Sequence, residues 1–190
     1  MTGSYDASLV ALSMVVAVMA SYVALDLGAR VTASSNTRAR WYWLLGGAVS
    51  MGVGIWSMHF IGMLAFDMGM PASYDAPLTL LSLLIGMGSS AWALWVISNH
   101  RLGHLDLLGG GIVMGAGIAA MHYTGMAAMH VDPPVTYSVP LVALSLLVAV
   151  LAATAAIWIA FSLRTDTARW VLAKKAGSAL LVGLGVYGMH

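Results

Sequence analysis

The sequence predicts an all-α integral membrane protein: a six-helix bundle made of three parallel two-helix repeats in a pseudo-threefold arrangement. Composition is the first observation behind this prediction. Of the 190 residues, 61% are hydrophobic and only 8% are charged, and the mean hydropathy of +0.90 lies outside the range of soluble domains. A formal net charge of +1 gives no indication of a nucleic-acid partner. The absence of cysteine excludes disulfides, thiolate metal sites and cysteine nucleophiles.

The second observation is the spacing of apolar stretches. A membrane-spanning helix needs about 20 largely apolar residues, and six stretches meet this requirement. They lie at about residues 7–29, 41–66, 76–98, 105–129, 139–163 and 170–190. The segment before the first stretch contains no Lys or Arg, so it lacks the basic region of a cleaved signal peptide. We therefore expect the lipid bilayer to surround all six helices.

Charge distribution predicts the orientation of these helices. All eight Lys and Arg residues lie in or beside the first, third and fifth connections. Positive charge is enriched on the cytoplasmic side of membrane proteins, so these connections should be cytoplasmic. The N-terminus and the second and fourth connections carry aspartates and no basic residue. We therefore expect the N-terminus to lie outside.

The third observation is internal repetition. The segment "SYDASL" at 4–9 returns as "SYDAPL" at 73–78 and more loosely as "TYSVPL" at 136–141. The even-numbered stretches share the pattern G-x-G-[IV]-x-x-M-H, in "GVGIWSMH", "GAGIAAMH" and "GLGVYGMH". The repeats occupy about residues 4–72, 73–135 and 136–190, with the third one truncated. Each repeat has an even number of spans, so the copies are parallel and related by an axis along the membrane normal.

The repeated Met-His pairs fall at one depth in the membrane. Each histidine follows an arginine by 21 residues, which is roughly 31 Å of helix and close to the thickness of the hydrocarbon core. The pairs should therefore lie near the outer face. Small residues mark helix interfaces in membranes, and polar side chains facing lipid are costly, so we expect the histidines to converge near the axis.

This convergence predicts a metal site. Its candidate ligands are one Met-His pair from each repeat: His59, His122, His190, Met58, Met121 and Met189. Secondary candidates are Met63 and Met126, four residues after the first two histidines, and the adjacent Tyr123. Imidazole together with thioether sulfur favours copper, whereas histidines alone would favour zinc. Haem bound by two histidines is a further alternative.

Simpler roles remain open for several of these residues. Methionine is commonly packing filler in a helix bundle, and a single intramembrane histidine can serve as an interhelical hydrogen-bonding group. His100 and His104 are expected in a polar loop beside the membrane, and His130, which aligns with Asp67, in a solvated loop. Asp26 and Arg30 have the spacing of an ion pair near the cytoplasmic surface.

The segment "MHYTGM" at 121–126 resembles the signature of the MHYT domain, a bacterial integral-membrane sensor module, and the resemblance covers the whole chain. The first copy reads "MHFIGM", with Phe60 and Ile61 in place of Tyr and Thr, and the third ends after His190. The resemblance implies a location in the bacterial inner membrane, a copper ion, and sensing of a diatomic gas (oxygen, carbon monoxide or nitric oxide) or of redox state. It also implies a cytoplasmic output domain, such as a diguanylate cyclase or a phosphodiesterase, in the full-length protein.

We therefore expect a membrane sensor domain that is not itself an enzyme. Because the last stretch ends within its motif, we expect the natural protein to continue beyond His190. The alternative function is a three-histidine zinc hydrolase, for which Asp67 is the best outer carboxylate. A transporter is disfavoured because the helices carry almost no ionisable residue near mid-membrane. The sequence leaves the oligomeric state open, including a homodimer.

Overall fold

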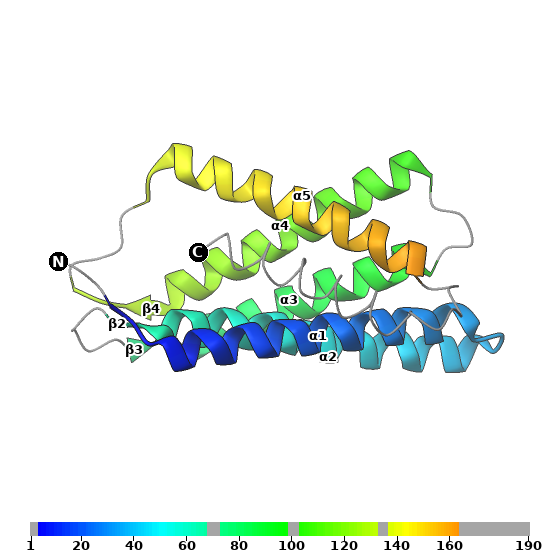
Figure 1. The fold of residues 1–190 in the computed structure, drawn as a ribbon, viewed down its shortest axis with the longest axis horizontal. Coiled ribbons are helices and arrows are strands. Elements are labelled where there is room, and N and C mark those ends of the chain that lie inside the picture. The colour runs from blue at the N-terminus through cyan, green and yellow to red at the C-terminus, as the bar shows by residue number, and fades with distance from the viewer. Residues whose placement is uncertain (1–3, 68–72, 99–102, 133–136, 164–190) are drawn as a thin grey trace.

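The computed structural model describes residues 4–67, 73–98, 103–132 and 137–163 (Figure 1). They form five long helices: α1 (Ala7–Ala33), α2 (Thr37–Ala65), α3 (Ala76–Ile97), α4 (His104–Ala128) and α5 (Val139–Leu163). Four short strands lie at one end of the bundle: β1 (Ser4–Tyr5), β2 (Phe66–Asp67), β3 (Ser73–Tyr74) and β4 (Met129–His130). The sixth predicted span, at 170–190, lies outside the described residues.

All five helices are long and apolar enough to cross a membrane. Large aliphatic side chains remain exposed along them, among them Leu12, Leu84 and Leu147. A helix satisfies its backbone hydrogen bonds internally, so such a surface can face lipid without cost to the polar backbone. The chain is therefore a multi-pass membrane protein, and five of the six predicted spans are confirmed.

The first hairpin extends further than its apolar residues predicted. Helix α1 continues to Ala33, and α2 begins at Thr37. The side chain of Asn36 caps α2 by accepting a hydrogen bond from the Arg38 N–H at 2.9 Å. Arg30 pairs with Asp26 at 2.7 Å, as predicted, and its guanidinium lies 5.1 Å from the centre of the Trp43 ring. Polar residues thus prolong both helices beyond the hydrophobic stretch at this end, which we call the arginine end.

The prediction of a purely α-helical fold needs one correction, because the opposite end carries two antiparallel ribbons. β1 pairs with β2 and β3 with β4, in equivalent registers that place Ser4 opposite Asp67 and Ser73 opposite His130. His130 therefore lies in a strand rather than in a loop, at the repeat position predicted from Asp67. Strands of two residues show no periodicity in sequence, and for this reason they escaped prediction. We call this end the strand end.

The ribbons close each helical hairpin at its open side. The Asp6 N–H donates to the Ala65 carbonyl and the Asp75 N–H to the Ala128 carbonyl, both at 2.8 Å. Each aspartate also caps the helix that follows it, with its carboxylate accepting backbone N–H groups. The two SYD segments thus have the same structural role in both repeats.

Glycines determine how neighbouring helices pack. A Cβ placed on Gly52 would lie 2.6 Å from the Met87 Cα in α3, and one on Gly115 would lie 2.6 Å from the Val150 Cα in α5. Met87 and Val150 are themselves equivalent, because each lies nine residues after the leucine of the repeated SYD segment. The first glycine of G-x-G therefore packs against the odd-numbered helix of the following repeat.

The second glycine of G-x-G packs within its own repeat. A Cβ on Gly54 would overlap Ala20 in α1, and a Cβ on Gly117 would overlap Ser89 in α3. Ala20 and Ser89 are again equivalent positions. Backbone contacts this close explain why the pattern requires glycine, as is usual for close helix pairs in membranes. Both sets of contacts follow the repeat without a register shift.

Candidate metal centre

Two of the three repeated histidines meet in the structure. His59 lies near the strand end of α2 and His122 near the same end of α4, and their Nδ1 atoms are 3.3 Å apart. The ring centroids are 4.7 Å apart, with the planes inclined by 58°. His59 is 2% exposed, and His122 is partly buried. Equivalent residues of two repeats therefore converge inside the bundle, as the motif predicted.

A glycine makes room for the first imidazole. A Cβ on Gly125 would lie 3.0 Å from the His59 Nε2 and 3.3 Å from its Cδ2. Gly125 is the glycine of the MHYTGM segment, three residues after His122, and the first repeat has Gly62 at the same place. This role was not predicted from the sequence, although the glycine recurs in both complete motifs.

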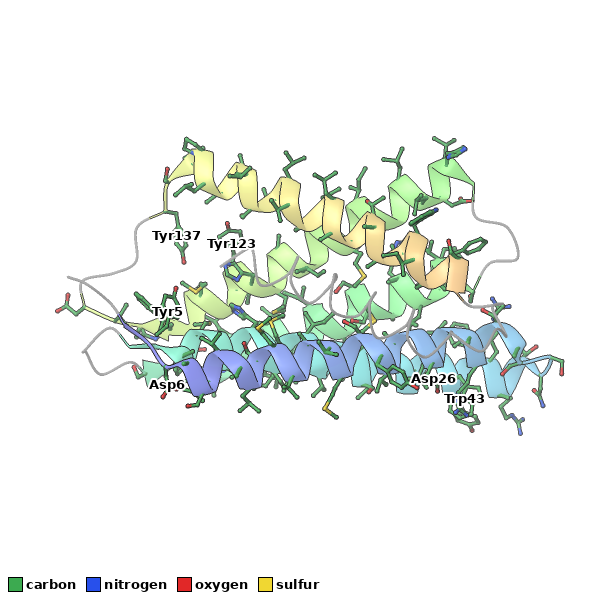
Figure 2. The ribbon with its side chains drawn as sticks, viewed as in Figure 1. Tyr5, Asp6, Asp26, Trp43, Tyr123 and Tyr137 are labelled. Carbon is green, nitrogen blue, oxygen red and sulfur yellow. The ribbon has the colours of Figure 1, made fainter. Side chains whose placement is uncertain are left out.

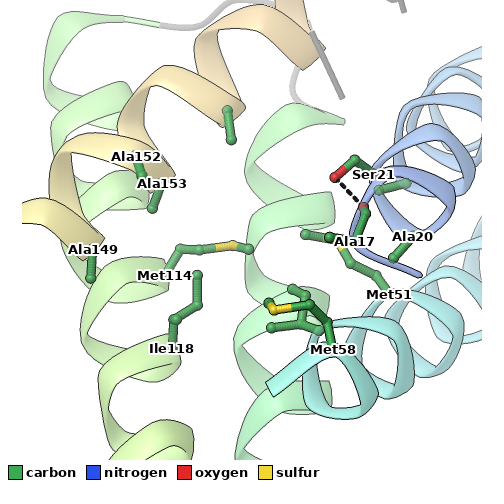
Figure 3. Close-up of a pocket in the computed structure, with 13 residues that line it drawn as sticks. Ala17, Ala20, Ser21, Met51, Met58, Met114, Ile118, Ala149, Ala152 and Ala153 are labelled. Atoms are coloured by element: carbon green, nitrogen blue, oxygen red, sulfur yellow. Dashed lines mark hydrogen bonds between the residues drawn. The ribbon is translucent and has the colours of Figure 1, made fainter. Parts of the chain in front are cut away.

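The methionines beside the two histidines face other surroundings. Met58 is buried and lines a narrow apolar cavity of about 50 Å³ between α1, α2, α4 and α5, together with Met51 and Met114 (Figure 3). Met121 is 2% exposed and lies against α3, where a Cβ on Gly86 would be 3.5 Å from the Met121 Cγ. These contacts are those of core residues, and a ligand role for either methionine stays a prediction.

The secondary candidates have different surroundings. Met63 is buried in α2, whereas Met126 lines a pocket at the strand end. Met189 and His190 lie outside the described residues. The structure thus brings together two members of the predicted ligand set, His59 and His122.

Tyr123 connects the second histidine to α5. Its ring contacts the His122 imidazole edge-on at 4.9 Å between centroids, and its hydroxyl lies 2.7 Å from the Ser145 Oγ. Ser145 donates its own hydrogen to the Val142 carbonyl at 2.8 Å, so the tyrosine is the donor to Ser145. Tyr123 also lies beside Tyr137, with centroids 5.8 Å apart (Figure 2). Burial, and secondarily the neighbouring Tyr123, raises the pKa of the Tyr137 phenol.

The two imidazoles have a spacing that suits a metal ion. Two nitrogens bound tetrahedrally to one ion at about 2.0 Å are roughly 3.3 Å apart, and this is the separation between the two Nδ1 atoms. In the metal-free protein the same separation allows an N–H···N hydrogen bond. Among the described residues, no group of three or more His, Asp or Glu side chains can hold a metal. A metal held here by three such side chains would need a ligand from outside the described residues, and His190 is the residue equivalent in sequence.

The lack of a third clustered side chain among the described residues also bears on the alternative function, a zinc hydrolase. A zinc hydrolase needs a carboxylate beside its metal-bound water as a base. Within the described part of the chain, neither Asp67 nor another carboxylate joins the two histidines in such a cluster. His104 is exposed at the start of α4, at the arginine end, while His100 lies outside the described residues.

Fold and site together define a repeat-built, multi-pass membrane protein with paired histidines near one end of the bundle. Comparison with known families identifies the family of the chain. Residues 1–46, 52–110 and 115–173 match the MHYT family, described as "Bacterial signalling protein N terminal repeat". The chain belongs to this family, as the MHYTGM segment indicated.

Three relatives illustrate the setting of such chains. The chain is 52% identical, over 98% of its length, to the bifunctional diguanylate cyclase/cyclic di-GMP phosphodiesterase MucR of Pseudomonas aeruginosa, of which it covers 27%. It is 42% identical to the cyclic di-GMP phosphodiesterase NbdA of the same species, covering 98% of the chain and 24% of the relative. It is 35% identical to the signaling protein YkoW of Bacillus subtilis, and the similarity covers 98% of the chain and 23% of YkoW.

The chain thus spans about a quarter of the length of these relatives. It corresponds to their MHYT sensor region, and the remainder of each relative lies outside the similarity. No solved structure matches the chain.

Proposed function

We propose that this chain is the membrane sensor of a longer bacterial signalling protein, in which His59, His122 and His190 hold one copper ion near the outer membrane face. The observation that carries the proposal is the 3.3 Å separation of the His59 and His122 Nδ1 atoms. These residues belong to different repeats and different helices, and they are equivalent in sequence. A pair of unrelated core histidines would have no reason to follow the repeat.

The packing of the glycines supports a third, equivalent position. By the observed register, Gly183 and Gly185 of the third repeat correspond to the first and second glycines of G-x-G. The expected partners are Val18 in α1 for Gly183 and Ala152 in α5 for Gly185. On this proposal, a sixth helix between α5 and α1 would satisfy both contacts and close a pseudo-threefold ring. The same repeat relationship would bring His190 to Gly62, as His59 lies against Gly125.

Ligand chemistry supports copper as the metal. Neutral imidazoles bind copper and zinc, and the neighbouring thioethers of Met58, Met121 and Met189 would shift the preference to Cu(I) if they join the site. Three imidazoles would leave one coordination position of a bound metal open, and oxygen, carbon monoxide or nitric oxide could bind there. A change in redox state would instead alter the oxidation state of the metal.

The proposal includes a path from the site toward an output domain. The contact from His122 through Tyr123 to Ser145 joins the candidate centre to α5, a helix that spans the bundle. A shift of the imidazole that favours another bundle arrangement would bias the position of α5. MucR and NbdA are named as cyclic di-GMP enzymes, so a cytoplasmic domain that makes or degrades this messenger is the proposed recipient.

Metal analysis tests the proposal directly. The chain is purified without chelators, reconstituted with copper or zinc, and analysed by mass spectrometry of the bound metal. We expect His59→Ala, His122→Ala and His190→Ala each to remove one copper equivalent per chain, because each leaves the centre with two imidazoles. His104→Ala, at the arginine end, is the matched control and should retain wild-type copper content. Equal copper content in wild type and the three histidine variants would disprove the centre.

A further inference from the structure

We propose a second metal site in this chain: a surface pocket at the strand end that binds Cu(I) through Met126, Met129 and His130. The pocket has a volume of about 320 Å³ and is lined by these three side chains and by the rings of Tyr123 and Tyr137. It lies between the end of α4 and the segment leading to α5. The site is separate from the buried histidine pair and does not require it to hold metal.

The donor types select a soft monovalent ion. Thioether sulfur prefers Cu(I) among the common metals, and imidazole completes a three-donor set that hard cations such as Mg²⁺ or Ca²⁺ would not choose. Met126 lies in the last turn of α4 and Met129 is the first residue of β4, and both side chains line the same pocket. His130 is exposed in β4, which allows its ring to turn toward an ion in the pocket.

The first repeat shows the same corner with only one of the three proposed donors. The residues equivalent to Met126, Met129 and His130 are Met63, Phe66 and Asp67. Phe66 and Asp67 occupy β2 in the same register as Met129 and His130 occupy β4. The fold therefore accepts Phe and Asp at these two positions, and the second thioether and the imidazole are features of repeat 2 alone.

This comparison provides a variant that removes two of the three donors while keeping the fold. Met129→Phe/His130→Asp converts the corner of repeat 2 into the sequence that repeat 1 already carries. A second variant, Met126→Leu/Met129→Leu, preserves apolar volume but removes both sulfurs. Met19→Leu, an exposed methionine on α1, is the matched control.

The experiment is an anaerobic competition of detergent-solubilised protein with the chromophoric Cu(I) chelator bicinchoninate. We expect both corner variants to lose one Cu(I) equivalent, with at least a tenfold weaker dissociation constant for that site, and Met19→Leu to bind as wild type. His59→Ala/His122→Ala should keep this equivalent. Circular dichroism and the unfolding temperature of each variant verify that the bundle is intact.

The outcomes separate this site from the buried centre. The surface site is disproved if both corner variants bind as many Cu(I) equivalents as wild type with dissociation constants within twofold. It is also disproved if His59→Ala/His122→Ala binds no Cu(I). A wild type that binds a single equivalent, lost in the corner variants, supports the surface site and contradicts the buried one.

Discussion

The imidazole of His59 in α2 lies directly against Gly125 in α4, where a Cβ would be 3.0 Å from the His59 Nε2. The two residues are separated by 66 positions, yet each belongs to a copy of the same motif. The glycine of one motif thus receives the histidine of the preceding one. The candidate centre is therefore formed by contacts between successive repeats, and a single helix cannot form it.

Gly125→Ala should disturb the histidine pair and the adjacent Phe60 ring, whose Cε2 would lie 3.3 Å from the new Cβ. Contacts of 3.0 and 3.3 Å to the ring leave a methyl group too little room, so the His59 ring must shift away from its present position. We expect copper affinity to fall at least tenfold in the metal-binding assay. Gly109→Ala in the same helix has nothing within 4 Å of the new Cβ, and it should bind copper as wild type does. Equal copper affinities of the two variants would show that the space left by Gly125 for the His59 imidazole has no role in the site.

The fold could be predicted from sequence where apolar length and motif spacing determine it. Five spans, the equivalence of Asp67 with His130, and the ion pair of Asp26 with Arg30 follow from pattern alone and are confirmed. The two ribbons could not be predicted, because two residues carry no strand periodicity. Their formation depends on helix ends that first meet in the folded bundle.

Substituting the first glycine of G-x-G should destabilise the bundle. In Gly52→Ala and Gly115→Ala the new Cβ would lie 2.6 Å from backbone atoms of Met87 and Val150, which cannot move independently of their helices. Overpacking of this kind costs about 1–3 kcal/mol, so the unfolding temperature in detergent should fall for both variants to a similar extent. Gly46→Ala, with nothing within 4 Å of its Cβ, should unfold at or above the wild-type temperature. A stable Gly115→Ala protein would contradict the packing of α4 on α5.

The site could be predicted only in part. The repeat predicted that the histidines converge, and the structure shows this for His59 and His122. Their depth in the membrane, inferred from the spacing to an arginine, stays a prediction. Spacing could not give the direction of side chains in the interface. For this reason the cavity lined by Met58 and the contact of Gly125 with the His59 imidazole could not be predicted from the sequence.

The membrane orientation can be tested on the natural background, because the chain contains no cysteine. Ser35→Cys lies between α1 and α2 at the arginine end, and Ser73→Cys lies in β3 at the strand end; both serines are exposed. The positive-inside rule predicts that a membrane-impermeant maleimide labels position 73 from outside intact cells and position 35 only after the membrane is opened. The reverse pattern would put the histidine pair on the cytoplasmic side and contradict a sensor of external signals.

The tyrosine pair predicts a pH effect at the strand end. Burial, followed by the charge of Tyr123, raises the pKa of Tyr137 above its ordinary value of 10.0, so the folded protein holds the phenol proton more tightly than the unfolded chain does. This contribution to stability is intact below pH 10 and is lost as the pH rises through the higher, folded-state pKa. Tyr123→Phe removes the second cause but leaves the burial, so the pKa of Tyr137 should fall partway toward 10.0. The measurement is an ultraviolet phenolate titration in which the difference from Tyr137→Phe isolates this residue. Ser145→Ala, which retains both phenols, is the control, and an unchanged Tyr137 titration in Tyr123→Phe would show that the two rings do not interact electrostatically.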